Sequence, residues 1–328
     1  MKVLITGAGG FIGSHLVEDQ LRRGREVKAL DINASNIAHL ERKYGNLEII
    51  PGDMKDESLL DRATSGVDRV FHLASVHLSI ATPDEEYRRV NVEATRKLLQ
   101  ICCKKNVSRF VHCSSVGVYG KIKEPPVNED SACVPESIYD ITKLEGERQV
   151  LQFHKETSFP VVVVRPAWVY GPRCQRTLRL FRSIARGRFL FIGDGKPLRH
   201  CIYVSDLVEG FELCAEMETA VGQIYNMADN QPLSIRELVE KIATVIGTSP
   251  PRTSIPAWMI YPVCFTVEIG CKFLGKEPPI SRRSLNFFTG NTNFNISKAK
   301  RELGFNPKTS LDEGLKLTYD WILAKGDI

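Results

Sequence analysis

The chain has 328 residues, of which 43% are hydrophobic and 25% charged, as is usual for a globular protein that buries a substantial core. A net charge of +5 that is spread along the chain is too small to indicate nucleic-acid binding. Nine cysteines with no C-x-x-C pair give neither a disulfide framework nor zinc spacing, so we expect no metal site and a reducing, cytoplasmic compartment.

The first half of the chain alternates short apolar runs with helical patterns. Strands are predicted, in chain order, at KVLIT, EVKAL, LEII, DRVFHLAS, RFVHCSS and PVVVVRP. Helices are predicted near Ile12–Arg23, after Asp56, over Asp84–Lys104 and around Tyr139. Short β-branched strands separated by helices pair in parallel through right-handed crossovers. The pattern therefore predicts an α/β protein with a doubly wound parallel sheet of the Rossmann type.

After PVVVVRP the alternation loosens. We predict a dinucleotide-binding domain over 1–171, to which 201–226 returns, and a smaller C-terminal substrate lobe made of 172–200 and 227–328. The most apolar stretch, Ile255–Leu274, carries charges and is interrupted by prolines, which favours a substrate-covering helix over a stable membrane span. Shallow contact with a membrane surface stays open. The start, MKVLITGAGG, reads as a strand and a turn rather than as a signal peptide.

A glycine-rich turn, TGAGGFIGSHL, follows the first strand and opens the first helix. A side chain at Gly7 or Gly10 would keep the backbone away from a pyrophosphate, whereas Gly13 lets the helix pack closely on the sheet. The helix N-terminus, with Phe11 and Ile12 in its first turn, then faces the anion. The alternative, a plain glycine turn, is disfavoured because the motif lies between a strand and a helix.

The second predicted strand ends at Asp31, in VKALDIN. A carboxylate at this place accepts hydrogen bonds from the adenosine ribose hydroxyls and repels a 2′-phosphate, which favours NAD over NADP. No arginine follows at Ile32 or Asn33 to bind such a phosphate. The alternative is an aspartate that caps a turn.

Tyr139 and Lys143 are four positions apart in YDITK, on a predicted helix. Positions i and i+4 lie on one helix face, so the ammonium group can sit beside the phenol. A nearby cation lowers the pKa of a tyrosine and makes it usable as a general acid or base. Taken alone, the pair is better explained as part of a helix surface, because Y-x-x-x-K is common by chance.

With these motifs, the chain resembles the extended short-chain dehydrogenases/reductases, the group that contains nucleotide-sugar epimerases and 3β-hydroxysteroid-type dehydrogenases. The matching pieces are, in order, TGAGGFIG, GDM, HLAS, NVEAT, SSVGVYG, YDITK, RPAWVYGP, IYVSDLV and SKAKRELGF. They extend over nearly the whole chain, and their order and spacing carry the resemblance. It implies an NAD-dependent enzyme and a homodimer.

The resemblance also implies the roles of individual residues. Tyr139 corresponds to the catalytic tyrosine, Lys143 to the lysine that lowers its pKa and binds the nicotinamide ribose, and Ser115 to the hydroxyl that holds the substrate oxygen. Ser114 is not chosen, because side chains alternate along a strand end. Further cofactor-binding positions are implied at Asp53, Met54, Leu73, Ala74 and Asn91.

Two regions bear on the reaction and the substrate. Relatives that dehydrate or decarboxylate nucleotide sugars carry acids after the active-site hydroxyl, where this chain has Val116 and Gly117, so we expect only epimerisation or alcohol–ketone interconversion. Arg199 corresponds to an arginine that binds a substrate diphosphate, with a solvated loop arginine as the alternative. Arg282 or Arg283 is a candidate for a second phosphate contact.

Arginines at helical spacing follow the last predicted strand, and a solvated helix face explains them better than an anionic substrate entrance does; they are Arg176, Arg179, Arg182 and Arg186. The segment PAWMIYPVCFTVEIGCKFLGKEPPISRRSLNFFTGN resembles instead the apolar insertion of 3β-hydroxysteroid-type members. The leading hypothesis is an NAD-dependent epimerase acting at C4 of a UDP-sugar through a 4-keto intermediate. The alternative is an NAD-dependent dehydrogenase of a sterol-like or other apolar alcohol.

Overall fold

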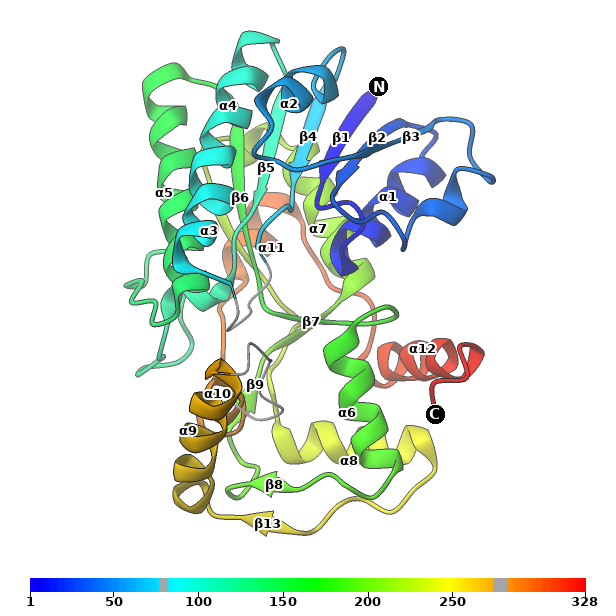
Figure 1. The fold of residues 1–328 in the computed structure, drawn as a ribbon, viewed down its shortest axis with the longest axis vertical. Helices are drawn as coiled ribbons and strands as arrows, with labels where there is room; N and C mark the ends of the chain where they lie inside the picture. Colours follow the sequence, from blue (N-terminus) through cyan, green and yellow to red (C-terminus); the bar gives the residue numbers. More distant parts are fainter. Residues whose placement is uncertain (77–81, 274–281) are drawn as a thin grey trace.

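The computed structural model describes residues 1–76, 82–273 and 282–328, without the side chains of 268–269, 272–273, 282–284 and 286. Its centre is a seven-stranded parallel sheet with the strand order β11-β6-β5-β4-β1-β2-β3 (Figure 1). The strands are β1 (Lys2–Thr6), β2 (Glu26–Asp31), β3 (Leu47–Pro51), β4 (Arg69–His72), β5 (Arg109–Cys113), β6 (Val161–Pro166) and β11 (Ile224–Met227). The predicted doubly wound α/β fold is confirmed.

Helices cover both faces of this sheet. One face carries α2 (Glu57–Ala63), α4 (Thr95–Lys104) and α5 (Ile138–Thr157), which pack side by side. The other face carries α1 (Phe11–Arg22), α7 (Val204–Glu216) and α11 (Ser297–Leu303). Parallel strands buried on both faces need apolar side chains at every position. In β1, accordingly, Val3 and Ile5 pack into the core under α1 while Leu4 packs into the core under α4.

The predicted helix over Asp84–Lys104 is continuous but not uniform. It consists of α3 (Asp84–Arg88), a π-helical turn over Arg89–Ala94 and α4. A π-helical turn holds one residue more than an α-helical turn, and such turns are frequent at functional sites.

A second group of helices and short strands, the C-terminal lobe, lies beyond the carboxyl ends of the sheet strands (Figure 1). Its helices are α6 (Gln175–Ala185), α8 (Ile235–Ile246), α9 (Ala257–Phe273), α10 (Arg282–Thr289) and α12 (Leu311–Ala324). Its short strand pairs are β7 (Trp168–Tyr170) with β10 (Cys201–Tyr203), β9 (Leu198–Arg199) with β12 (Leu233–Ser234), and β8 (Phe191–Ile192) with β13 (Ser254–Ile255). A separate apolar core joins α6, α8 and α12. The division of the chain into two domains stays a prediction.

Two helices of the lobe, α6 and α9, differ in the kind of side chain that they expose to solvent. On α6, Leu178 and Phe181 are buried, whereas Arg176 and Arg179 are exposed, as on the predicted amphipathic helix. On α9 the exposed side chains are themselves apolar, with Trp258 75% exposed and Phe265 48% exposed. Among the described residues, no helix combines the length and the apolar character needed to cross a membrane. Residues 274–281 of the apolar insertion lie outside the described residues.

Candidate active site

The glycine turn between β1 and α1 is packed so tightly that side chains are excluded from it. A Cβ on Gly7, whose φ is +69°, would come within 2.7 Å of the backbone nitrogen of Ala74. A Cβ on Gly13 would lie 2.1 Å from the carbonyl oxygen of Gly7, where a helix residue approaches the turn. Gly10 caps α1 without a side-chain bond, so the first turn presents its N–H groups, including those of Phe11 and Ile12, beyond the end of the helix. This arrangement suits an anion.

Asp31, at the end of β2, ties the second strand to the glycine turn. Its Oδ2 accepts a hydrogen bond from the Gly9 N–H at 2.8 Å, and its Oδ1 accepts one from the Asn33 N–H at 2.8 Å. A carboxylate can accept about four hydrogen bonds, so both oxygens keep capacity for a ribose hydroxyl. Asp31 therefore does cap a turn, as the alternative interpretation held, and this leaves room for the predicted hydrogen bond to the ribose. Gly9 was not singled out by the sequence, although a Cβ there would lie 1.9 Å from the Asn33 carbonyl oxygen.

The other residues predicted to bind the cofactor follow the ends of β4 and β3, which lie on either side of β1 and β2 in the sheet. Leu73 and Ala74 follow β4 directly and touch the glycine turn, and the Ala74 N–H donates to Thr6 Oγ1 at 3.2 Å. Asp53 and Met54 follow β3, with Met54 buried against the core and Asp53 bonded to the Lys55 N–H at 2.9 Å. Their contact with the cofactor stays a prediction.

Asn91 lies in the π-helical turn and is buried. Its Oδ1 accepts from the Val76 N–H at 2.9 Å, and its Nδ2 donates to Thr142 Oγ1 at 2.9 Å. It thereby links the segment after β4 to α5, one residue before Lys143. No motif in the sequence pointed to Thr142 or Val76.

Ser115 follows β5 and caps a short 3-10 turn, Val116–Tyr119, by accepting from the Gly117 N–H at 3.0 Å. Its side chain is half-buried, whereas Ser114 is buried with an Oγ that lacks a hydrogen-bond partner among the described residues. The alternation that favoured Ser115 is therefore seen in the burial of the two residues. Ser115 therefore lies just beyond the carboxyl end of β5, with its side chain partly exposed.

Tyr139 stands in the first turn of α5, and its pKa differs from the expected direction. The pKa of Tyr139 is raised to about 12, with burial as the largest influence and the neighbouring Cys113 and Asp140 as smaller ones. A hydrogen bond with Ser75 and the positive charge of Arg176 act in the opposite direction. The expectation of a lowered pKa was wrong for this state of the protein, because loss of solvent outweighs the nearby cations.

Lys143 lies one helical turn after Tyr139 and is buried. Its Nζ donates to the carbonyl oxygen of Cys113, the last residue of β5, at 2.5 Å. Burial lowers the pKa of Lys143, while the negative charges of Cys113 and Glu147 raise it. The lysine therefore lies between the end of β5 and the helix that carries the tyrosine.

A buried ion pair between Arg165 and Glu147 holds the elements that carry Ser115, Tyr139 and Lys143. Arg165 of β6 donates from Nε to Glu147 Oε2 at 3.0 Å and from Nη2 to Oε1 at 2.5 Å. Its Nη1 donates to the hydroxyl of Tyr119 at 2.8 Å. Glu147 belongs to α5 and Tyr119 ends the turn that begins after Ser115. The pair thus fixes α5 and this turn on the same strand.

Arg199 is buried between β9 and α10 rather than solvated. Its Nη1 donates to the Leu198 carbonyl at 3.2 Å, its Nη2 donates to the Phe287 carbonyl, and its guanidinium lies 4.7 Å from the centre of the Phe287 ring. Burial lowers the pKa of Arg199 to about 10. The solvated-loop alternative was wrong, and the diphosphate contact stays a prediction. The side chains of Arg282 and Arg283 lie outside the described residues.

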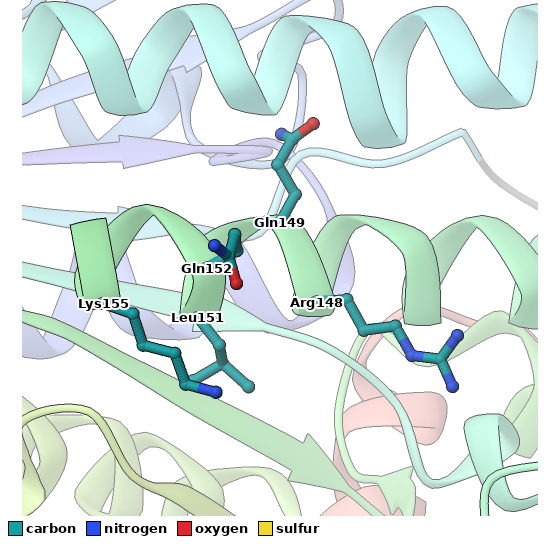
Figure 2. Close-up of a pocket in the computed structure, with 5 residues that line it drawn as sticks. All are labelled: Arg148, Gln149, Leu151, Gln152 and Lys155. Carbon is teal, nitrogen blue, oxygen red and sulfur yellow. The ribbon is translucent and has the colours of Figure 1, made fainter.

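A surface hollow of about 510 Å³ lies elsewhere, along the last turns of α5 (Figure 2). Its lining residues are Arg148, Gln149, Leu151, Gln152 and Lys155. Gln149 points toward the neighbouring helical segment and donates to the Val92 carbonyl at 3.0 Å. The hollow begins nine residues after Tyr139 on α5, about 13 Å along the helix axis, and so is separate from the candidate active site.

The residues present fit NAD: a cradle that side chains would fill, a helix N-terminus for the pyrophosphate and a carboxylate at the end of the second strand. They define a dinucleotide-dependent protein, while the catalytic roles of Ser115, Tyr139 and Lys143 stay predictions. The model of the NAD dependent epimerase/dehydratase family matches residues 3–228. The chain belongs to this family, and its cofactor is NAD.

Relatives with different substrates resemble the chain over its whole length. An N-acetyl-alpha-D-glucosaminyl-diphospho-ditrans,octacis-undecaprenol 4-epimerase of Escherichia coli O157:H7 is 29% identical over 99% of this chain and 97% of its own. A 3-beta-hydroxysteroid dehydrogenase of Mycolicibacterium neoaurum is 28% identical over 96% of this chain and 89% of its own. The UDP-glucuronic acid 4-epimerase of Bacillus cereus, solved in complex with NAD, is 27% identical, with a TM-score of 0.81 over 99% of both chains.

Proposed function

We propose that the protein is an NAD-dependent 4-epimerase of a sugar carried on a diphosphate, with a UDP-sugar as the leading substrate. The observation that carries the proposal is the set of Ser115, Tyr139 and Lys143 at the carboxyl end of the sheet, next to the glycine turn. Two of the relatives named above are 4-epimerases of diphosphate-linked sugars, which supports this choice over other reactions of the family.

In this reaction Tyr139 removes the proton of the sugar 4-hydroxyl, and Ser115 donates a hydrogen bond to the same oxygen. NAD would be held by the glycine turn and Asp31 and would supply a reversible hydride acceptor for C4, with no net consumption of the nucleotide. Tyr139 gives the proton back to the 4-oxygen when C4 is reduced again. Because burial raises the pKa of Tyr139 to about 12, proton removal at neutral pH requires a cation closer to the phenol. We expect the Lys143 ammonium to turn from the Cys113 carbonyl to meet this need.

The exchange of Tyr139 for phenylalanine tests the assignment. Tyr139→Phe removes the group that transfers the proton, and such groups contribute about 10²–10⁴-fold to turnover. NAD affinity should be retained, because the ring remains and the nucleotide is held by the glycine turn. Tyr319→Phe, on α12, is the matched control and should leave turnover unchanged. A Tyr139→Phe protein with undiminished epimerisation would refute the proposal.

Arg199 tests whether the substrate carries a diphosphate. A phosphate brought beside this buried guanidinium would offset the cost of its burial, and charge-assisted bonds of this kind contribute about 1.5–3 kcal/mol. Arg199→Ala should therefore weaken UDP binding to the NAD-loaded protein about tenfold or more, measured by calorimetric titration. Arg199→Lys keeps the positive charge but loses the two-pronged guanidinium group, so its affinity for UDP should lie between those of the unaltered protein and Arg199→Ala. Absence of measurable UDP binding to the unaltered protein would overturn the diphosphate assignment.

A second candidate is a dehydrogenase of an apolar alcohol. The exposed apolar side chains of α9, among them Trp258 and Phe265, favour it, and so does the resemblance to a 3-beta-hydroxysteroid dehydrogenase. The two candidates differ in what happens to the cofactor. An epimerase turns over many times on one equivalent of NAD, whereas a dehydrogenase reduces one NAD for each alcohol oxidised. NADH formation in proportion to the substrate consumed would favour the second candidate.

A further inference from the structure

The position of Gly117 bears on the expectation that this site lacks a second acid. The φ angle of Gly117 is outside the left-handed region, so its backbone does not require glycine. The space beside it does, because a Cβ on Gly117 would lie 1.9 Å from Oδ1 of Asp140 and 2.8 Å from its Cγ. The same Cβ would lie 3.2 Å from Oγ of Ser115. The carboxylate of Asp140 therefore occupies the volume where a side chain of residue 117 would begin.

Asp140 is held in this position by the start of α5. Its Oδ2 accepts a hydrogen bond from the hydroxyl of Ser137 at 2.5 Å, and its own N–H donates to Ser137 Oγ at 3.2 Å. The N-terminal end of a helix also stabilises a negative charge. Within the described part of the chain, the hydrogen bonds of Asp140 use Oδ2 and the backbone N–H, which leaves Oδ1 directed at Gly117.

The charge of Asp140 also reaches the proposed proton-transfer group. Burial is the main cause of the raised pKa of Tyr139, and the negative charge of Asp140 adds to it. Ser115 and Tyr139 are the two side chains assigned to the substrate oxygen. The Asp140 carboxylate therefore lies beside Gly117, next to Ser115, and acts electrostatically on Tyr139.

We propose that Asp140 binds a hydroxyl group of the sugar and makes the site select uncharged sugars over uronic acids. The inference rests on the proposed function and adds the substrate class. Oδ1 of Asp140 accepts a hydrogen bond from a sugar hydroxyl at the side of the ring that faces Gly117. A uronic acid would bring a second carboxylate near Asp140. Two neighbouring carboxylates repel each other strongly once water is excluded from between them.

The sequence-based expectation changes accordingly. An acid is absent from positions 116 and 117 in the chain, but α5 supplies one to the same space. Gly117 and Asp140 thus act as a matched pair, since any side chain at 117 would displace the carboxylate. Asp140 is a specificity residue in this proposal, whereas the proton of the 4-hydroxyl stays with Tyr139.

The test measures kcat/KM for UDP-glucose and UDP-glucuronic acid with the NAD-loaded protein. We expect the unaltered protein to prefer UDP-glucose. Asp140→Asn should reduce the ratio of the two values by about tenfold or more, because one charge-assisted bond weakens and one repulsion is lost. Asp130→Asn, an exposed aspartate in the loop before α5, is the control and should leave the ratio unchanged.

Two further variants keep the test decisive. Gly117→Ala should lower the same ratio by displacing Asp140, although it changes no charge. Asp140→Ser serves if Asp140→Asn does not fold, with NAD binding as the measure of folding. An unaltered protein that prefers UDP-glucuronic acid, or a ratio that Asp140→Asn and Asp140→Ser leave unchanged, would overturn the inference while the epimerase proposal stands. Failure of the unaltered protein to bind UDP would overturn both this inference and the diphosphate assignment on which it rests.

Discussion

Removal of the Glu147 carboxylate is predicted to destabilise the protein more than any surface substitution. Glu147 and Arg165 are 1% and 3% exposed, and two hydrogen bonds join them. Burial alone would lower the pKa of Arg165, but the bonds and the charge of Glu147 raise it above its ordinary value. The arginine therefore stays charged in the folded protein, and Glu147→Ala would leave that charge buried without its acid.

The magnitude follows from this burial. Removal of one partner from a buried ion pair costs about 3–5 kcal/mol, because the remaining charge has lost both its partner and its water. Two bonds of Arg165, to the Tyr119 hydroxyl at 2.8 Å and to the Glu129 carbonyl at 3.2 Å, remain and keep the loss toward the lower end. Replacement of both partners, Glu147→Leu with Arg165→Met, should recover part of the loss, since no unpaired charge is then buried.

The assay is the free energy of unfolding from urea titration, with turnover measured in parallel. Lys241→Ala breaks an exposed pair with Asp312 and is the control, for which we expect about 1 kcal/mol or less. Turnover of Glu147→Ala should also fall, because α5 and the turn after Ser115 both rest on Arg165. A Glu147→Ala protein within about 1 kcal/mol of the unaltered one would refute the view that the pair is buried and charged.

Three further predictions concern the cofactor site and pH. Gly13→Ala would place a Cβ 2.1 Å from the Gly7 carbonyl oxygen, so we expect it to lower both the melting temperature and the affinity for NAD. Unchanged NAD affinity would contradict the close packing of the glycine turn. Asp31→Ala should weaken NAD binding about tenfold and narrow the preference over NADP, measured by titration of both nucleotides; tighter NADP binding by the unaltered protein would contradict it. Burial and the charge of Asp206 raise the pKa of Asp229 to about 7, so the folded state binds the extra proton and stability should fall as pH rises from about 4 to 7. Asp229→Asn should flatten that part of the stability profile, and an unchanged slope would count against the assignment.

The fold could be predicted because its signals are local. Six strands of the main sheet were predicted from short apolar runs, and the glycine turn lies between a strand and a helix as the motif requires; β11 (IYNM) was not predicted. Ser115 was assigned through the family resemblance, and the alternation of side chains at a strand end argued only against Ser114; its role stays a prediction. These features depend on residues that are neighbours in the chain.

The features that were missed depend on contacts between distant segments. Asp140 stands in a space left by Gly117, and nothing in either local sequence relates the two. Arg199 was predicted to bind a diphosphate, but its burial under α10, where it contacts Phe287, could not be read from the local sequence. The pKa of Tyr139 was assigned from one neighbour, Lys143, whereas the burial that dominates it comes from several elements at once.

The π-helical turn at Arg89–Ala94 also constrains how the chain can change in length. Deletion of one residue there would restore regular α-helix and rotate α3 by about 100° relative to α4. The Asn91 side chain could then no longer meet both the Val76 N–H and the Thr142 hydroxyl. Insertions and deletions among descendants of this chain should therefore collect in its surface loops and spare this helical run, whose residue count is set by two hydrogen bonds of a single asparagine.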